Sequence, residues 1–279
     1  MTKLAVIGGS GVYKLDTIEL VDEFVIETPF GQPSSSVKLL KTSKGDEFYF
    51  IPRHGEGHIY NPSEINYRAN IYALKTLGVD KIVSISAVGS LKEEHAPGKF
   101  VIPSQFLDWT KGLRKRTFFE KGVVGHVSAA ELVNRDMQKE IAQELQDIGI
   151  ESSLGGTYVC IEGPQFSSRA ESALYRSFGA DIIGMTNLPE ANLAKEAGIA
   201  YVTVAMVTDY DCWKDEHCTV EEIMKVMKGN YEKAQKLLTG LVSRVKDISV
   251  EPENKYAIVS NMENLDQGQK EIISTLLND

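Results

Sequence analysis

The feature that most constrains this chain is an alternation of short apolar runs with segments of helical periodicity, repeated along most of its 279 residues. Apolar runs such as Leu4–Ile7 and Tyr201–Thr208 predict buried strands. Segments such as Glu190–Ala197 and Val220–Val245 predict helices. Strands that alternate with helices form a parallel or mixed sheet covered on both faces. The sequence therefore predicts one α/β domain with a mixed central sheet flanked by helices.

The remaining elements are expected from turn and capping residues. Further strands are expected at Val37–Leu40, Glu47–Ile51, Lys81–Ser86, Gly156–Ile161 and Asp181–Gly184. Capping residues predict helices that begin at Asn61-Pro62-Ser63-Glu64 and end at Leu77, and that begin at Ser168. Periodicity predicts another over Met137–Ile148. The acidic tail, 248–279, is expected to carry a helix near Gln267–Leu277, with its docking left open.

Composition excludes several classes of partner. The net charge of −9 and the pI near 5.2 argue against nucleic acid or an acidic membrane, so an anionic substrate needs a local cationic pocket. Three cysteines are too few for a disulfide framework, which favours a reducing cytoplasm. The first apolar run ends at Gly8, too early for a signal peptide, and no stretch approaches the roughly 20 apolar residues of a membrane span.

Unusual residues gather directly after the expected strands. In open α/β sheets, ligands bind beyond the carboxyl ends of the strands. Segments that are distant in the sequence are therefore candidates for a single pocket. These segments are Gly8–Gly11, Arg53-His54, Ser86-Ala87, Met185-Thr186 and Thr208–Asp211.

Two acidic residues, Asp209 and Asp211, follow the apolar run that ends at Thr208. In an extended segment, residues two apart point to the same side. When water is excluded, two carboxyl groups this close do not both ionise freely, so one holds a proton. Such a pair can protonate one atom of a 6-aminopurine and accept from its exocyclic amine. The competing interpretation is a pair of solvated turn residues.

Four segments offer groups for an anion. Gly8-Gly9-Ser10-Gly11 can present backbone N–H groups and a hydroxyl, although it matches neither a dinucleotide motif nor a Walker loop. Arg53 suits bidentate phosphate recognition and stands beside His54. Ser86-Ala87 and Thr186 add hydroxyls. The competing interpretations are an ordinary turn at the glycines and a structural ion pair at Arg53.

Two further side chains are candidates for contact with a nucleoside. Phe166 follows a Gly-Pro turn, where its ring can stack on a base or staple the next helix. Met185 adjoins Thr186, but methionine is more often core filler than a ligand contact. His54 and His58 have no third ligand at supporting spacing, so no metal site is expected.

Taken together, seven motifs resemble the trimeric purine nucleoside phosphorylases, most closely their branch that acts on 5′-methylthioadenosine. The resemblance covers about residues 3–245, and its motifs are GGSG, PRHG, NYRANIYALK, SAVGSL, IEGPQFSSRAE, GMTNLPEANLAKEAGI and VTDYDCW. It implies a nucleoside phosphorylase-like fold over residues 1–247, assembled as a homotrimer with active sites near the subunit interfaces. The tail after residue 247 is outside the resemblance.

The resemblance also implies roles for individual residues. Its phosphate site falls on Ser10, Arg53, His54, Ser86, the Ala87 backbone and Thr186. Its nucleoside contacts fall on Met185, Phe166, Thr208, Asp209 and Asp211, on an apolar wall of Ile223 and Met224, and on His126 lent to the neighbouring subunit. Ser10 and Ser86 stand where the closest branch usually has Thr, and both keep a hydroxyl.

The activity implied is phosphorolysis of 5′-methylthioadenosine to adenine and 5-methylthioribose 1-phosphate, a pentosyl transfer in purine and methionine salvage. Asp209 is the expected proton donor to N7, with Asp211 accepting from the 6-amino group. General acid catalysis of this kind contributes about 10²–10⁴-fold. Inorganic phosphate is a co-substrate, and neither a metal nor an organic cofactor is expected.

Three alternatives remain open at this point. The same fold can carry a 6-oxopurine or methylthioinosine phosphorylase, for which an aminopurine is the poorer substrate. A hydrolytic nucleosidase would use water in place of phosphate. A purine-binding sensor would bind without turnover. Dependence of base release on phosphate and on the 6-substituent separates these possibilities.

Overall fold

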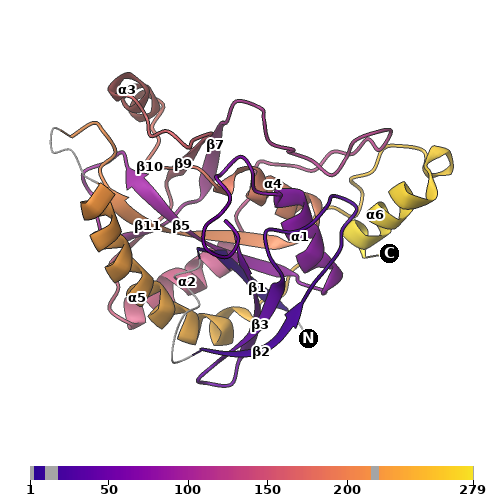
Figure 1. Ribbon diagram of the computed structural model, residues 1–279, viewed down its shortest axis with the longest axis horizontal. Coiled ribbons are helices and arrows are strands. Elements are labelled where there is room, and N and C mark those ends of the chain that lie inside the picture. The colour runs from indigo at the N-terminus through magenta and orange to yellow at the C-terminus, as the bar shows by residue number, and fades with distance from the viewer. Residues whose placement is uncertain (1–2, 10–17, 215–219, 279) are drawn as a thin grey trace.

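One large mixed sheet forms the centre of the computed structural model, which describes residues 3–9, 18–214 and 220–278 (Figure 1). Within these residues the sheet has eleven strands. They are β1 (Leu4–Gly8), β2 (Ile18–Phe24), β3 (Val37–Thr42), β4 (Glu47–Pro52), β5 (Lys81–Ser90), β6 (Phe100–Ile102), β7 (Gln105–Trp109), β8 (Ser152–Leu154), β9 (Thr157–Ile161), β10 (Ile182–Gly184) and β11 (Ala200–Asp209).

Strand β5 lies at the centre of this sheet. The main path runs β2-β3-β4-β1-β5-β10-β9-β7, and β11 pairs with β5 as well as with β6. Strands β4, β1, β5 and β11 are parallel, so their carboxyl ends meet at one edge. Strand β10 is antiparallel to the last residues of β5, where Ile183 lies opposite Gly89. The last residues of β5 are therefore paired with β10 as well as with β11.

Helices cover both faces of the sheet (Figure 1). They are α1 (Tyr67–Thr76), α2 (Arg135–Asp147), α3 (Arg169–Ser177), α4 (Asn187–Glu196), α5 (Val220–Val245) and α6 (Gln267–Leu277), with a 3₁₀ turn, η1, at Met262–Asn264. None of the helices in the described part of the chain combines the length and the apolar character needed to cross a membrane.

The side-chain alternation of β1 shows why two cores form. Ala5 and Ile7 belong to the core beneath α1 and α4, whereas Leu4 and Val6 belong to the core beneath α2 and α5. Successive residues of a strand point to opposite faces, so a fully apolar strand is stable only when both faces are covered. This arrangement confirms the predicted α/β class with a mixed central sheet.

Two expected boundaries are wrong by four residues or more. The helix expected from Asn61 begins instead at Tyr67, with Asn66 as its cap. Asn61 and Glu64 do make the expected capping hydrogen bonds, but they close only a single turn. Strand β5 runs on to Ser90 rather than ending at Ser86, because β11 and β10 continue to pair with it up to Gly89 and Ser90.

The C-terminal tail docks on the α1 side of the molecule. Helix α6 occupies the expected residues, and the Tyr72 hydroxyl of α1 donates to Thr275 Oγ1 of α6 at 3.0 Å. Asn254 is fully buried and donates to the carbonyls of Glu196 and Leu276 at 2.8 and 2.9 Å. Asn254 therefore joins the tail to the end of α4, and it supplies a donor to two backbone carbonyl oxygens, one in α4 and one in α6. The domain boundary at residue 247 stays a prediction.

Candidate active site

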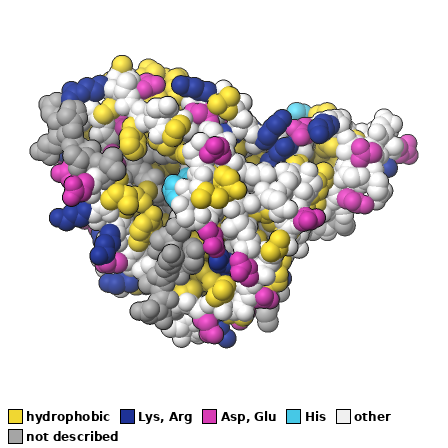
Figure 2. Space-filling view, in the orientation of Figure 1, with side chains coloured by type: hydrophobic (Ala, Val, Ile, Leu, Met, Phe, Trp, Pro, Cys, Tyr) yellow, Lys and Arg dark blue, Asp and Glu magenta, His cyan; other side chains and the backbone are white. Residues whose placement is uncertain are grey.

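A cavity of about 590 Å³ lies at the edge where β1, β4, β5 and β11 end. Its walls contain Arg53-His54, Ser86-Ala87 and Met185-Thr186, together with Thr208, Asp209 and Asp211. In Figure 2 a histidine side chain is visible in a hollow of this face, with hydrophobic side chains beside it. Segments as far apart in sequence as residues 53 and 211 thus meet in one cavity, as the strand-end rule predicts.

A bulge in β11 aims the acidic pair into this cavity. The register of β11 against β5 shifts between Val207 and Asp209, and Asp209 lies opposite Gly89. A bulge of this kind re-aims side chains next to a site. A Cβ atom on Gly89 would lie 3.3 Å from Asp209 Oδ2 and 3.6 Å from the Cβ of Asp211. Gly89 therefore allows both acidic residues to approach the strand closely.

The two carboxyl groups have different surroundings. Asp209 accepts from the Thr208 hydroxyl at 2.6 Å and from the Asp211 backbone N–H at 2.9 Å. Asp211 has a left-handed backbone, with φ of 49°, and its Oδ2 lies 3.9 Å from the Cys212 thiol. Burial raises the pKa of both carboxyl groups, and the charge of Asp209 raises the pKa of Asp211 further. The pair therefore retains a proton more readily than free carboxyl groups do.

The Thr208 hydroxyl indicates where that proton is best placed. It lies 2.6 Å from Asp209 Oδ1 and 3.1 Å from the carbonyl oxygen of Val88. A hydroxyl donates one proton, so it cannot donate to both oxygens at once. If Asp209 is protonated, it can donate to Thr208 while Thr208 donates to Val88. The protonated form of Asp209 thus satisfies both contacts.

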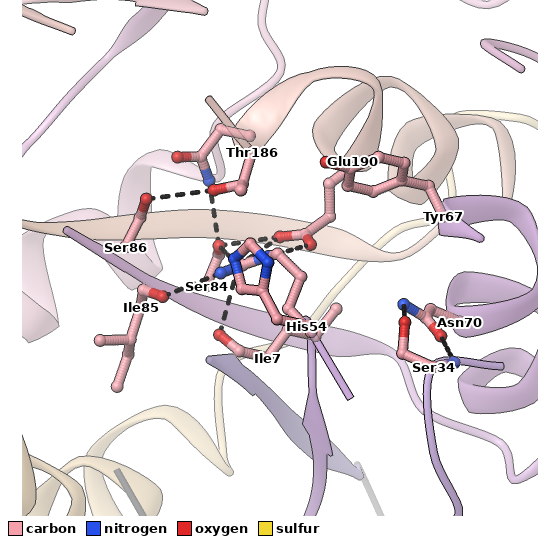
Figure 3. A network of polar contacts seen from close by, with 12 residues as sticks. Ile7, Ser34, His54, Tyr67, Asn70, Ser84, Ile85, Ser86, Thr186 and Glu190 are labelled. Atoms are coloured by element: carbon pink, nitrogen blue, oxygen red, sulfur yellow. Dashed lines mark hydrogen bonds and ion pairs between the residues drawn. The ribbon is translucent and has the colours of Figure 1, made fainter. Parts of the chain in front are cut away.

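Arg53 lies buried at the other end of the cavity and is paired with Glu190 of α4. Its Nε and Nη2 donate to the Glu190 carboxylate at 2.7 and 2.9 Å, and both side chains are at most 2% exposed. Nη1 donates to the Ile85 carbonyl, and Nη2 also contacts Ser84. Figure 3 shows Glu190 and Ser84 facing each other in this network. Burial disfavours the charged guanidinium, but Glu190 more than offsets this and raises its pKa.

This pairing limits what Arg53 can offer to an anion. Most of its N–H groups are already used by Glu190, Ser84 and backbone carbonyls. Its positive charge is matched by a carboxylate within hydrogen-bond distance. An anion at this end of the cavity therefore needs further donors, such as hydroxyl and backbone N–H groups.

His54 is held in a defined orientation beside Arg53. Its Nδ1 lies 2.9 Å from the Tyr60 carbonyl oxygen, which can only accept, so Nδ1 carries the proton of the neutral ring. The ring stacks on that of His58, with centroids 4.1 Å apart. Burial, together with the charge of Arg53, lowers the pKa of His54 to about 4. His54 is therefore neutral at physiological pH.

Ser86 and Thr186 bring two hydroxyls together at the same end. Their oxygens are 3.2 Å apart, and both side chains are buried. Thr186 directly precedes α4, whose backbone departs from helical geometry at Leu188. Ser86 comes from β5, so strand and helix supply the two hydroxyls independently.

The other expected contact residues fall into two groups. Phe166, Met185 and Ile223 line the cavity, and Phe166 is 70% exposed. Met224 does not line it and is 59% exposed. His126 is exposed on a segment paired with the C-terminal tail, away from the cavity of its own chain. Ser10 lies outside the described residues.

Sequence reasoning missed four residues around the cavity. Met227 and Tyr231 of α5 line it one and two turns after Ile223. Glu190 was expected only as the first residue of a helix and as part of a motif, although a glutamate between apolar residues in a buried helix is itself a signal of a buried cation.

Arg114 is the fourth missed residue, and it ties two cavity walls together. It forms an ion pair with Glu162 at 3.0 Å, and donates to the carbonyls of Glu162, Met185 and Leu188 at 2.7 Å each. The loop before Phe166 and the loop at Met185 are therefore held by one buried side chain. No group of His, Cys, Asp and Glu suited to a metal ion occurs within residues 3–9, 18–214 and 220–278.

The fold and its cavity place the chain among nucleoside phosphorylase-like proteins. The chain belongs to the phosphorylase superfamily, whose family model matches residues 3–243. It is 44% identical to the S-methyl-5′-thioadenosine phosphorylase of Geobacter sulfurreducens, over 98% of this chain and 97% of the relative. It is 51% identical to that of Rhodospirillum rubrum, over 88% and 83%. The family resemblance seen in the motifs is thereby confirmed.

Solved structures agree with this placement. A crystal structure of a methylthioadenosine phosphorylase from an antarctic soil metagenomic library superposes with a TM-score of 0.93, at 42% identity over 99% of both chains. The methylthioadenosine phosphorylase of Schistosoma mansoni in complex with adenine has a TM-score of 0.83, at 30% identity over 100% of this chain and 98% of that one.

Proposed function

We propose that this protein cleaves 5′-methylthioadenosine with phosphate, giving adenine and 5-methylthioribose 1-phosphate. The observation that carries the proposal is the division of one cavity into two chemically different ends. Asp209 and Asp211, with raised pKa values, lie at one end. Arg53, Ser86 and Thr186 lie at the other. The names of the relatives support the same reaction.

At the acidic end, the purine leaves as its N7 becomes protonated. Asp209 supplies this proton, since burial raises its pKa and so favours the protonated form. Asp211 accepts from the 6-amino group. A 6-oxo group would instead turn lone pairs toward this carboxylate, at a cost of about 1–3 kcal/mol. The acidic pair thus supports a preference for aminopurines.

At the other end, phosphate attacks C1′ of the sugar as the bond to the purine breaks. The hydroxyls of Ser86 and Thr186 and the Ala87 backbone bind it, together with the charge of Arg53 and the hydroxyl of Ser10. His54, neutral and fixed through Tyr60, accepts from a protonated phosphate oxygen. The bound anion also stabilises the positive charge that develops on the sugar. The reaction requires no cofactor.

The 5′-methylthio group lies against an apolar wall of α5. Ile223 and Met227 line the cavity, and Phe166 and Met185 complete its apolar surface toward the nucleoside. His126 is exposed and does not line the cavity of its own chain, which is consistent with a homotrimer in which it serves the neighbouring site. The homotrimer and the cytoplasmic location remain predictions from the sequence.

A substrate panel tests this function. Purified protein is incubated with 5′-methylthioadenosine, 5′-methylthioinosine, adenosine and inosine, each with and without phosphate, and base release is followed by liquid chromatography. We expect adenine from methylthioadenosine only when phosphate is present. Faster turnover of the 6-oxo substrates would assign an oxopurine phosphorylase. Base release without phosphate would indicate hydrolysis, and binding without turnover would indicate a sensor.

A further inference from the structure

One face of α5 carries a row of side chains along the cavity. Ile223, Met227 and Tyr231 are spaced four residues apart, and all three line the cavity. Residues at this spacing lie above one another on a helix. The first two are apolar, whereas Tyr231 ends in a hydroxyl. The row therefore changes from apolar to polar toward its C-terminal end.

Tyr231 reaches the segment that follows β1. Its hydroxyl oxygen lies 3.2 Å from the position that a Cβ atom on Gly9 would occupy. Gly9 also lines the cavity, directly after the end of β1 at Gly8. The row on α5 thus ends at the same side of the cavity as the expected anion loop.

The hydroxyl of Tyr231 has no hydrogen-bond partner in the described part of the chain, although its ring packs against the core beneath α2 and α5. The side chain is half-buried, and burial raises the pKa of its phenol. It therefore remains a neutral hydrogen-bond donor at physiological pH. A half-buried donor without a partner gains most from a ligand that accepts.

The backbone beneath Tyr231 is fixed to the sheet. The preceding residue, Asn230, is buried and donates to the Val207 carbonyl at 2.9 Å. Lys233 donates to the Gly98 carbonyl at 2.7 Å. These bonds hold this turn of α5 against β11, so the phenol is placed by a rigid element.

We propose that the Tyr231 hydroxyl donates a hydrogen bond to the co-substrate phosphate. The inference rests on the proposed phosphorolysis, and it answers a shortage of donors at this end of the cavity. Arg53 gives most of its N–H groups to Glu190, Ser84 and backbone carbonyls. A hydrogen bond to a charged acceptor is stronger than one between neutral groups. Tyr231 thus contributes to phosphate affinity from the side of Gly9.

The test compares Tyr231→Phe with the wild-type protein. Removing the hydroxyl should raise KM for phosphate roughly tenfold. It should leave KM for the nucleoside and kcat at saturating phosphate within about twofold, because the lost bond serves phosphate binding alone. Tyr49→Phe is the matched control, since Tyr49 is also half-buried but lies outside the cavity. An unchanged KM for phosphate, or an equal rise in KM for the nucleoside, would overturn the proposal.

A binding measurement separates this proposal from the proposed function. Calorimetric titration with inorganic phosphate alone reports affinity without turnover. We expect Tyr231→Phe to bind phosphate roughly tenfold more weakly than the wild type and Tyr49→Phe to bind it equally well. If the wild type binds phosphate but cleaves no nucleoside, the function fails while this inference stands. If all three proteins bind phosphate equally, the inference fails.

Discussion

Among single residues, Asp209 and Asp211 differ in how firmly each is held. Asp209 receives two hydrogen bonds from its own segment, whereas Asp211 is turned by a left-handed backbone. Trp213 donates to the Ser90 carbonyl at 2.8 Å and anchors the end of this segment on β5. The two hydrogen bonds orient the Asp209 carboxyl, which suits a group proposed to deliver a proton to one atom of the purine.

Asp209→Asn removes the proposed proton donor while keeping the size of the side chain. We expect kcat for methylthioadenosine to fall about 10²–10⁴-fold, because the purine must then leave without general acid assistance. Single-turnover release of adenine measures the effect on the chemical step. Phosphate affinity serves as the internal control and should not change. A variant with more than a tenth of wild-type kcat would contradict the role of Asp209.

The neutral state of His54 makes stability depend on pH. Its pKa is lowered from the ordinary 6.5 to about 4, so the unfolded chain binds more protons between these values. The folded protein is therefore destabilised as pH falls through this range. Relative to His54→Gln, the wild type should lose about 2 kcal/mol of unfolding free energy between pH 7.5 and pH 5. Urea denaturation in phosphate-free buffer measures this, and parallel pH profiles would contradict it.

Single residues also show which parts of the candidate site could be predicted from the sequence. Arg53, Asp209 and Asp211 could be identified because charged residues are unusual directly after apolar strands. Glu190 could not be paired with Arg53, since 137 residues separate them and only the fold brings them together. Whether Arg53 is a free ligand or a paired cation was therefore not decidable from its local motif.

At the scale of elements, the packing of α5 decides which of its methionines lines the cavity. Ile223 and Met227 are four residues apart and share a face, whereas Met224 is turned by about 100° from Ile223. The sequence placed α5 at the observed residues, but its helix carries methionines on two faces. Periodicity alone could not choose between Met224 and Met227, because the direction of the cavity depends on how α5 packs on β11.

Replacement of each methionine by alanine tests this geometry. Met227→Ala should lower kcat/KM for methylthioadenosine relative to adenosine by about 10-fold or more, since an apolar group in such a pocket contributes roughly 1–3 kcal/mol. Met224→Ala, at an exposed position, should change this ratio less than threefold in comparison. Competition assays with both nucleosides give the ratio directly. Equal effects of the two replacements would mean that both side chains contact the substrate.

The buried ion pair joins the end of β4 to α4. Glu190→Gln leaves Arg53 charged and without its carboxylate, at a cost of about 3–5 kcal/mol. Glu131→Gln is the control, since Glu131 pairs with Arg135 on the surface and should contribute under about 1 kcal/mol. Urea denaturation of the three proteins measures both effects. Similar losses of unfolding free energy in the two variants would show that the buried ion pair contributes no more to stability than the exposed one.

The elements that the sequence did not predict share a physical reason. Strands β6 and β8 have only three residues each, too few to establish a period. Strand β2 is mostly exposed and rich in acidic residues, so it lacks the apolar pattern of an inner strand. Strand β7 is half-buried along most of its length. Pairing with neighbours, rather than composition, defines these four strands.

At the scale of the whole molecule, the fold predicts where a site lies but not what completes it. The strand-end rule brought five distant segments together, four of them in the observed cavity and the fifth only partly within the described residues. The role proposed for His126 depends instead on a second chain. Its segment is braced by the tail, where His126 N–H donates to the Ala257 carbonyl at 2.8 Å and Val259 N–H to the Val124 carbonyl at 2.9 Å.

Mixed assemblies test whether His126 acts in the neighbouring site. Asp209→Asn removes the proton donor of its own chain, and His126→Glu places a carboxylate against the apolar wall of the next chain. In a cyclic trimer, a site is intact when its own chain carries Asp209 and its neighbour carries His126. Random mixing of the two variants in equal amounts makes about a quarter of the sites intact, because each condition is met half of the time.

We therefore expect co-refolded mixtures to recover about a quarter of wild-type activity, although each parent variant is nearly inactive. Parents mixed without refolding give the control, since their subunits are not exchanged, and light scattering gives the oligomeric state. If His126 served its own chain, every chain would carry one defect and mixing would restore nothing. Activity that never exceeds the average of the parents would therefore place each site within a single subunit.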